Sequence, residues 1–230
     1  MTTHARQPLA AVVEFEKLVD ETLLGASRAV AYRALFKRLL DVSIVLILAL
    51  PSLLIILGCA LLIARDGHSP FYFQKRVGQN GRVFQMWKLR SMLPDAERLL
   101  VAHLQSDPRA RAEWEHNQKL RKDPRITPIG RIIRKSSIDE LPQLWNVLRG
   151  EMSLVGPRPM MVEQRAIYPG TAYYAMRPGI TGFWQTSVRN ESSFTERARF
   201  DSDYLRDMSL ATDLKVLLRT VQVVWTGTGC

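Results

Sequence analysis

The sequence predicts an α+β protein that is mainly α-helical, contains one small β-hairpin, and is attached to a membrane without crossing it. Three observations predict this fold class. Residues 42–64 have no charged side chain and include a proline. Two short apolar runs flank an Asn-Gly pair, which is a strong hairpin signal. Several other segments repeat apolar residues at helical spacing, which predicts amphipathic helices that lie at an interface or pack on the domain.

The uncharged segment is long enough to reach across a membrane. At ~1.5 Å per residue, its 23 residues would match a ~30 Å hydrocarbon core. Pro51 lies near its middle, where it removes a backbone donor and bends a helix. Basic residues occur on both flanks, and such flanks stay on the cytoplasmic side: Arg33, Lys37, Arg38, Arg65, Lys75, Arg76. We therefore predict a re-entrant membrane helix over 37–65 that is broken at Pro51, with a full span and a buried core helix as the alternatives.

The other elements follow in order. Residues 1–36 form an extension with an amphipathic helix over 9–36, and residues 66–230 form a cytoplasmic domain. Within that domain we predict strands at Phe71–Val77 and Val83–Leu89, a charged helical stretch over 94–122, a loop over 122–130 and a helix within 132–148. Ordered loops are expected at 150–159 and 169–182, and a last amphipathic helix at Leu210–Trp225.

The amino-acid composition limits the classes of binding partner and the cellular compartment. The formal charge is +10, which suits anionic partners such as nucleic acid, an acidic membrane surface or phosphorylated substrates. Cys59 and Cys230 are the only cysteines, too few for a disulfide framework or a zinc site of their own, which is typical of a reducing compartment.

An adjacent pair of acidic residues, Asp139 and Glu140, is the strongest candidate for chemistry. Pro142 is tolerated only in the first turn of a helix, so a helix should begin just before it and place the acidic pair at its N-terminus. One interpretation is structural, because Ser137 and Glu140 have the spacing of a capping box. The other is catalytic: basic neighbours and a helix N-terminus favour ionised carboxylates, an ionised Asp can attack phosphorus, and a Glu can hold Mg²⁺.

Arginines in rigid frames accompany this pair. Arg158 lies between two prolines in Val-Gly-Pro-Arg-Pro, and Arg177 opens Arg-Pro-Gly-Ile-Thr-Gly. Stiff loops that present a guanidinium fork suit phosphate recognition. In the predicted hairpin, Lys88 and Arg90 are two residues apart and share one face of their strand. Each basic residue alone could serve a surface role, but together they surround one acidic pair beside a membrane segment.

These motifs, in this order, resemble those of the bacterial sugar transferase family, the monotopic polyprenyl-phosphate phosphoglycosyl transferases. The resemblance runs from about Phe36 to Trp225 and rests on five stretches: Trp-Lys-Leu-Arg-Ser-Met at 87–92, Ser-Ile-Asp-Glu-Leu-Pro-Gln at 137–143, Asn-Val-Leu-Arg-Gly at 146–150, Met-Ser-Leu-Val-Gly-Pro-Arg-Pro at 152–159, and Arg-Pro-Gly-Ile-Thr-Gly at 177–182.

The resemblance implies a small, single-domain member on the cytoplasmic face of the bacterial inner membrane, and it allows a homodimer. Such an enzyme would transfer a sugar-1-phosphate from a UDP-sugar to undecaprenyl phosphate through a covalent phosphosugar-aspartyl intermediate, releasing UMP. It would initiate exopolysaccharide or other glycoconjugate synthesis, with galactose or glucose favoured as the sugar.

The resemblance also implies roles for residues. Asp139 would be the nucleophile and Glu140 the Mg²⁺ ligand. Phosphate would be bound by Lys88, Arg134, Arg158 and, more weakly matched, Arg177. Asp201 matches a later acidic residue of the family, and Arg90 is a further candidate.

Two other functions compete with this enzyme. A nucleic-acid-binding protein would need aromatic residues interleaved with Lys and Arg, and Trp87 beside Lys88 is the only hint of that pattern. We therefore expect no nucleic-acid partner. A membrane scaffold would use the acidic pair only to cap a helix.

Overall fold

The computed structural model describes residues 31–117, 120, 122–187 and 196–225. Most of the helix predicted over 9–36 lies outside the described residues. The described chain begins with Ala31 and a π-helical turn, Tyr32–Phe36, that leads directly into helix α2, Lys37–Ile63.

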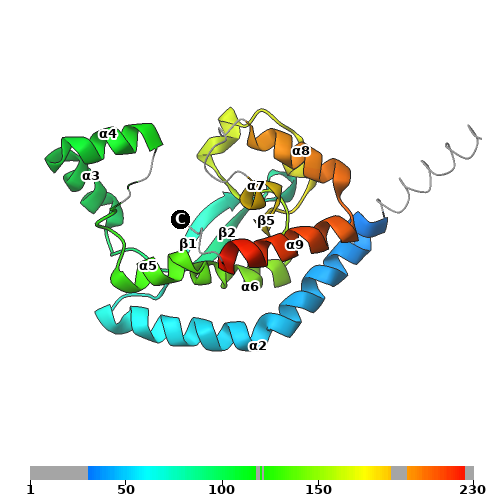
Figure 1. The fold of residues 1–230 in the computed structure, drawn as a ribbon, viewed down its shortest axis with the longest axis horizontal. Coiled ribbons are helices and arrows are strands. Elements are labelled where there is room, and N and C mark those ends of the chain that lie inside the picture. Colours follow the sequence, from blue (N-terminus) through cyan, green and yellow to red (C-terminus); the bar gives the residue numbers. More distant parts are fainter. Residues whose placement is uncertain (1–30, 118–119, 121, 188–195, 226–230) are drawn as a thin grey trace, which may run out of the picture.

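Helix α2 is continuous through Pro51 and bends near its middle (Figure 1). With its flanking turns it forms one helix, Tyr32–Asp66, of 35 residues, long and apolar enough to cross a membrane by length and composition. Most of its large apolar side chains are exposed, and Ile47 is 75% exposed. The alternative of a buried core helix is therefore wrong. The proline bends the helix without breaking it, because one missing donor interrupts only one turn of the hydrogen-bond ladder.

Both ends of α2 are fastened to the same folded domain. Near the start, Lys37 Nζ lies 2.6 Å from Asp213 Oδ2, and Arg38 donates to the carbonyl of Leu148 at 2.7 Å. After the end, Arg90 donates through Nη1 to Asp66 Oδ2 at 2.8 Å. The basic residues at the start of α2 thus have partners inside the protein as well as a charge suited to lipid headgroups.

The predicted hairpin is confirmed. Strands β1 (Phe71–Val77) and β2 (Val83–Leu89) pair antiparallel with Phe71 opposite Leu89, and β4 (Met160–Met161) adds to the other side of β1. The sheet order is β2-β1-β4, so β2 is an edge strand. In the turn, Asn80 (φ 55°) and Gly81 (φ 75°) adopt left-handed conformations, which is why an Asn-Gly pair closes this loop.

The two loops predicted at 150–159 and 169–182 meet and form a second, parallel sheet. Strand β3 (Ser153–Val155) pairs with β5 (Gly179–Thr181). Three-residue strands are too short to show an alternating pattern, so sequence periodicity did not reveal them.

Two predicted helical stretches are each divided in the structure. The stretch over 94–122 contains two helices because Asp107 Oδ1 accepts bonds from the amides of Arg109 and Ala110 and starts a new helix. The helix expected within 132–148 is likewise divided and begins earlier, because Thr127 caps it by accepting from the Gly130 amide at 2.9 Å. The remaining helices are α3 (Ala96–Ser106), α4 (Pro108–Asn117), α5 (Pro128–Lys135), α6 (Gln143–Leu148), α7 (Phe183–Thr186), α8 (Arg197–Asp207) and α9 (Leu210–Trp225), the last with the predicted bounds.

Two apolar clusters bind α2 to the domain. Val45 packs with Met152, Tyr204 and Val216 in the main core. Farther along, Ala60 and Ile63 pack with Leu89 of β2 and Ile133 of α5. Figure 1 shows α2 running beneath α5, α6 and α9, while α3 and α4 project away from the rest of the domain.

Candidate active site

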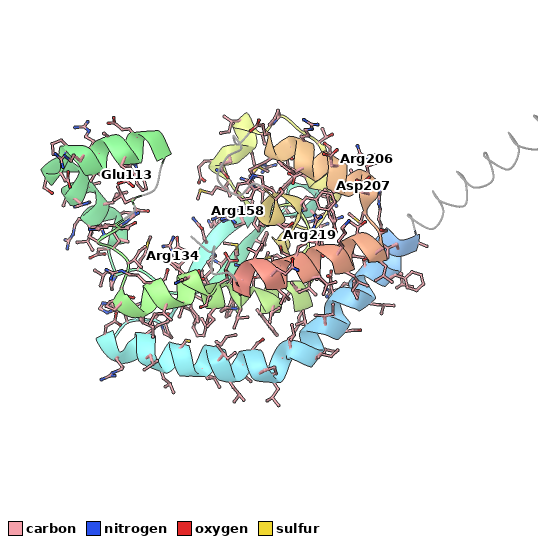
Figure 2. The ribbon with its side chains drawn as sticks, in the orientation of Figure 1. Glu113, Arg134, Arg158, Arg206, Asp207 and Arg219 are labelled. Carbon is pink, nitrogen blue, oxygen red and sulfur yellow. The ribbon has the colours of Figure 1, made fainter. Side chains whose placement is uncertain are left out.

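A pocket of about 430 Å³ gathers five of the residues singled out from the sequence. Lys88, Arg134, Asp139, Glu140 and Arg158 all line it. They come from β2, α5, the turn after α5 and the loop after β3, so segments up to 70 positions apart converge here. Figure 2 shows Arg134 and Arg158 approaching from different elements.

The acidic pair lies on a short 3₁₀ turn, Ile138–Glu140, between α5 and α6. Ser137 has a left-handed backbone (φ 56°), which ends α5 and redirects the chain. Its side chain makes no capping hydrogen bond, and Glu140 Oε1 accepts from Lys88 Nζ. The capping-box interpretation is therefore wrong, because the left-handed turn takes Ser137 out of capping geometry and Lys88 engages Glu140 instead.

Lys88 lies between the two carboxylates. Its Nζ is 2.6 Å from Glu140 Oε1 and 3.7 Å from Asp139 Oδ2. Lys88 and both acidic side chains are largely withdrawn from solvent. A cation thus already bridges the two acidic groups in a partly desolvated pocket, where charge interactions are stronger than in water.

Burial raises the pKa of Asp139 above its ordinary value. Lys88 and Arg134 oppose that rise, and the neighbouring Glu140 adds to it. The basic neighbours thus favour the ionised carboxylate, as expected, but withdrawal from water outweighs their effect on the pKa.

Asn146 on α6 fixes the turn against the edge strand. Its side chain accepts from the Trp87 amide at 3.1 Å and donates to the Gln85 carbonyl at 2.7 Å. The amide group therefore pairs with β2 as a neighbouring strand would, and it satisfies edge groups that would otherwise lack partners. This contact sets the distance between α6 and the strand that presents Lys88.

Two Gly/Pro loops pack backbone to backbone beneath Arg158. A Cβ on Gly156 would lie 2.4 Å from the Arg177 carbonyl oxygen, and one on Gly179 would lie 2.1 Å from the Gly156 amide. The Gly179 amide donates to the Pro157 carbonyl at 2.8 Å. The two motifs are thus halves of one rigid support that holds Arg158 at the rim of the pocket.

Arg158 also belongs to a cluster of arginines around Trp184. The guanidinium carbons of Arg158 and Arg197 lie 5.4 and 5.3 Å from the Trp184 ring centroid, within cation–π range. Arg197 donates to the Arg158 carbonyl at 2.9 Å. Burial, and secondly the charge of Arg158, lowers the pKa of Arg76 to about 10. Positive charges held this close favour binding of an anion.

Three further candidates do not line the pocket. Arg90 bonds to Asp66 after α2, although it neighbours Lys88 in sequence. Arg177 contributes its backbone to the support below Arg158. Asp201 on α8 is buried, accepts from the Tyr168 hydroxyl at 2.6 Å, and has its pKa raised to about 6, chiefly by burial.

Other lining residues were not singled out from the sequence. Thr181, Trp184, Gln185 and Thr220 line the pocket, and Arg197 supports it. Trp184 follows the Arg-Pro-Gly-Ile-Thr-Gly motif by two positions, and that closeness was the available signal. Arg197 begins α8, which was not predicted.

The donors of the pocket are compatible with a magnesium ion shared with a substrate. In the described ranges, no cluster of three or more His, Cys, Asp or Glu side chains has the geometry of a metal site. Mg²⁺ is commonly held by one or two carboxylates with substrate phosphates and water completing the shell. Asp139 and Glu140 supply two such carboxylates, and the position of Lys88 shows that they hold positive charge between them.

Comparison with known proteins gives consistent matches. The family model described as bacterial sugar transferase matches residues 32–227. A "UDP-galactose-lipid carrier transferase" of Erwinia amylovora is 48% identical over 182 residues, which cover 78% of this chain and 38% of that protein. The "Exopolysaccharide production protein ExoY" of Sinorhizobium fredii is 42% identical over 209 residues, 89% of this chain and 91% of that protein.

A third relative is the "Undecaprenyl-phosphate glucose phosphotransferase" of Komagataeibacter xylinus, 39% identical over 197 residues, 80% of this chain and 34% of that protein. The chain thus spans about two fifths or less of the Erwinia and Komagataeibacter proteins but nearly all of the Sinorhizobium one.

Proposed function

The chain belongs to the bacterial sugar transferase family, and we propose that it transfers a sugar-1-phosphate from a UDP-sugar to undecaprenyl phosphate. The observation that carries this proposal is the convergence of Asp139, Glu140 and three basic residues in one pocket beside the apolar helix α2. The names of the relatives favour galactose or glucose as the sugar and exopolysaccharide synthesis as the process.

The proposed chemistry has two displacements at one phosphorus. Asp139 attacks the sugar-bearing phosphorus, an Asp–phosphorus bond forms, and the bond to the UMP oxygen breaks. The acceptor phosphate then attacks the same phosphorus and releases the Asp139 carboxylate. Dividing the transfer into two steps is the usual advantage of covalent catalysis.

The basic residues balance the charge of the phosphoryl groups. Of the three basic residues, Lys88 lies nearest to Asp139. It would hold the carboxylate and a transferred phosphoryl oxygen together. Arg158, on its rigid support, and Arg134 on α5 would bind the diphosphate from two sides. After UMP leaves, the same positively charged residues would bind the phosphate of the acceptor.

Mg²⁺ would be held by Glu140, with Asp139 close by, and would supply neutralisation of the diphosphate charge. Binding of the ion requires Lys88 to move from Glu140 toward Asp139 or the phosphate. The flexible stem of a lysine permits that movement.

We further propose that α2 lies within one leaflet of the bacterial inner membrane, with the catalytic domain on its cytoplasmic face. Support comes from the two attachments of α2, since one domain holds both Lys37 and Asp66. A spanning helix would place those two residues on opposite sides of the bilayer. Ile132 on α5 and Trp145 on α6 are exposed as well, and both helices pack against α2.

The test uses purified protein in lipid nanodiscs with a panel of UDP-sugars. We expect UMP release that requires Mg²⁺ and is stimulated by undecaprenyl phosphate, with a lipid-linked product for one hexose. An acid-stable phosphosugar adduct on Asp139, seen by mass spectrometry of the intact protein without acceptor, would establish the covalent step. Absence of UMP release with every UDP-sugar would overturn the proposal.

A further inference from the structure

The pocket has two chemically different halves. Its charged half is formed by β2, α5 and the 3₁₀ turn, as described above. Its other half is an apolar wall made by three helices, and we use that name for Leu48 of α2, Leu144 of α6, and Leu217 and Val224 of α9. A pocket built only for a nucleotide sugar, which is polar throughout, would have little use for such a wall.

Two threonine hydroxyls beside the wall bond to each other. Thr181 and Thr220 both line the pocket there, and their hydroxyl oxygens are 2.7 Å apart. The Thr220 hydroxyl also bonds to the carbonyl of Val216 at 2.8 Å. Because these hydroxyls already have partners, this half of the pocket presents mainly hydrocarbon to a ligand.

The apolar wall is continuous with the exposed apolar surface of the molecule. On α2, Leu48 is 42% exposed and stands next to Ile47, which is 75% exposed. On α9, Leu217 and Val224 face the pocket, while Leu214, Leu218 and Val221 on the adjoining face are exposed. Thus each of these helices contributes to both the pocket and the surface, and an apolar chain could pass from one to the other without meeting a charge.

We infer that the apolar wall binds the first isoprene units of the acceptor, and that the chain leaves the pocket between α2 and α9 into the lipid. This inference rests on the proposed function and adds the place where the acceptor chain lies. The occupant follows from the arrangement: an anionic group fits between Lys88 and Arg158, and a hydrocarbon chain fits the wall that leads away from it. Branched isoprene units match the branched Leu and Val side chains that form the wall.

The first test compares two adjacent substitutions on α2. Leu48→Trp puts a large ring into the wall, whereas Ile47→Trp is a matched control on the exposed surface outside it. For each variant, kcat/KM is measured with undecaprenyl phosphate, and single-turnover UMP release is measured without acceptor. Leu48→Trp should lower kcat/KM for undecaprenyl phosphate at least 10-fold and leave acceptor-independent UMP release within 2-fold, and Ile47→Trp should leave both within 2-fold. Equal effects of the two substitutions on kcat/KM for undecaprenyl phosphate would overturn the inference.

Val224→Trp, on the opposite side of the exit, should reproduce the effect of Leu48→Trp, so the test does not depend on the folding of one variant.

The wild-type protein allows an independent experiment: a prenyl phosphate with a photoreactive group near its phosphate is cross-linked in nanodiscs. Modified peptides from α2 and α9 are expected, with the label displaced by undecaprenyl phosphate. Displacement by excess phosphatidylglycerol instead would identify the wall as a phospholipid contact, and labels elsewhere would contradict the path.

These outcomes separate the two proposals. If wild-type protein forms no lipid-linked product from any UDP-sugar, the proposed function fails. If it forms the product and Leu48→Trp behaves like Ile47→Trp, only the path of the acceptor chain fails.

Discussion

At the scale of residues, the protonation state of Asp139 would link stability to activity if Asp139 is the proposed nucleophile. Burial raises the pKa of its carboxyl group, whereas attack on phosphorus needs the ionised form. The folded protein therefore carries the ionised carboxylate at a cost when no substrate is bound. Lys88 and Arg134 reduce that cost without removing it.

Replacing Asp139 by Asn should abolish transfer and stabilise the fold. The pKa of the folded state lies above that of the unfolded state, so stability is lost as pH rises between these two values. At pH 7 the Asn variant should melt above the wild type, and the difference should shrink toward pH 4. Transfer should fall at least ~10³-fold. Circular dichroism melts and UMP release measure the two effects, and comparable turnover would sink the assignment of the nucleophile.

Asp201 offers a second pH prediction away from the pocket. Its pKa of about 6 in the folded protein exceeds the ordinary value of 3.8. As the pH rises from about 4 to about 6, the free energy of unfolding of the wild type should therefore fall relative to that of Asp201→Asn, by on the order of 3 kcal/mol. The Asn side chain keeps an acceptor for the Tyr168 hydroxyl. If the melting temperatures of the two proteins changed in parallel with pH, Asp201 would not have a raised pKa in the folded protein.

Arg158 should tolerate lysine poorly. Lysine keeps the charge but loses the planar fork and its stacking on Trp184. We expect Arg158→Lys to lower kcat/KM for the UDP-sugar by roughly 10²-fold, since two charge-assisted bonds are worth ~3 kcal/mol. The exposed Arg131 on α5 does not line the pocket, so Arg131→Lys is the matched control. Equal small effects would mean that only total charge matters.

At the scale of elements, the contact between α6 and β2 holds the two sides of the pocket together. Asn146 is fully buried and bonds to the backbone of β2 on both its oxygen and its nitrogen. Asn146→Leu should destabilise the protein by ~2–4 kcal/mol, because it leaves buried backbone groups without partners. It should also reduce activity, since Lys88 and the acidic turn would lose their fixed spacing. An unchanged melting temperature would show that water replaces the amide.

Local signals were sufficient where the chain decides its own structure. The Asn-Gly turn predicted the hairpin with both strand ends, and the apolar stripe of α9 predicted its bounds. The division at Asp107 was also readable, since Asp-Pro is a favoured helix start, but the charged stretch around it looked uniform.

Tertiary contacts decided the rest. The parallel pairing of β3 with β5 depends on glycines that let two distant loops touch, and no periodicity reports such contact. Glu140 fitted a capping box by spacing, but Lys88 from another element engages it. The sequence identified Lys88, Arg134, Asp139, Glu140 and Arg158, all of which the fold gathers, yet it grouped Arg90 with them. Neighbours two apart on a strand share a face, but Arg90 follows the end of β2 and turns to Asp66.

At the scale of the whole molecule, the two attachments of α2 make its topology testable. Single cysteines replace Leu35, which is exposed before α2, and His68, which is exposed after it, in a background without Cys59 and Cys230. Both should resist an impermeant thiol reagent in intact cells and react once the inner membrane is opened. A reaction at only one of them in intact cells would indicate a spanning helix.

The double attachment of α2 also determines by which route the acceptor would reach the pocket. A domain tied at Lys37 and at Asp66 cannot swing away from the bilayer on a tether, so its pocket stays at one depth. Acceptor would then arrive by lateral diffusion in two dimensions. The rate should follow the mole fraction of acceptor in the membrane rather than its amount per volume of solution. Adding inert phospholipid to vesicles at constant protein and acceptor should slow transfer, even though the bulk concentrations of protein and acceptor are unchanged.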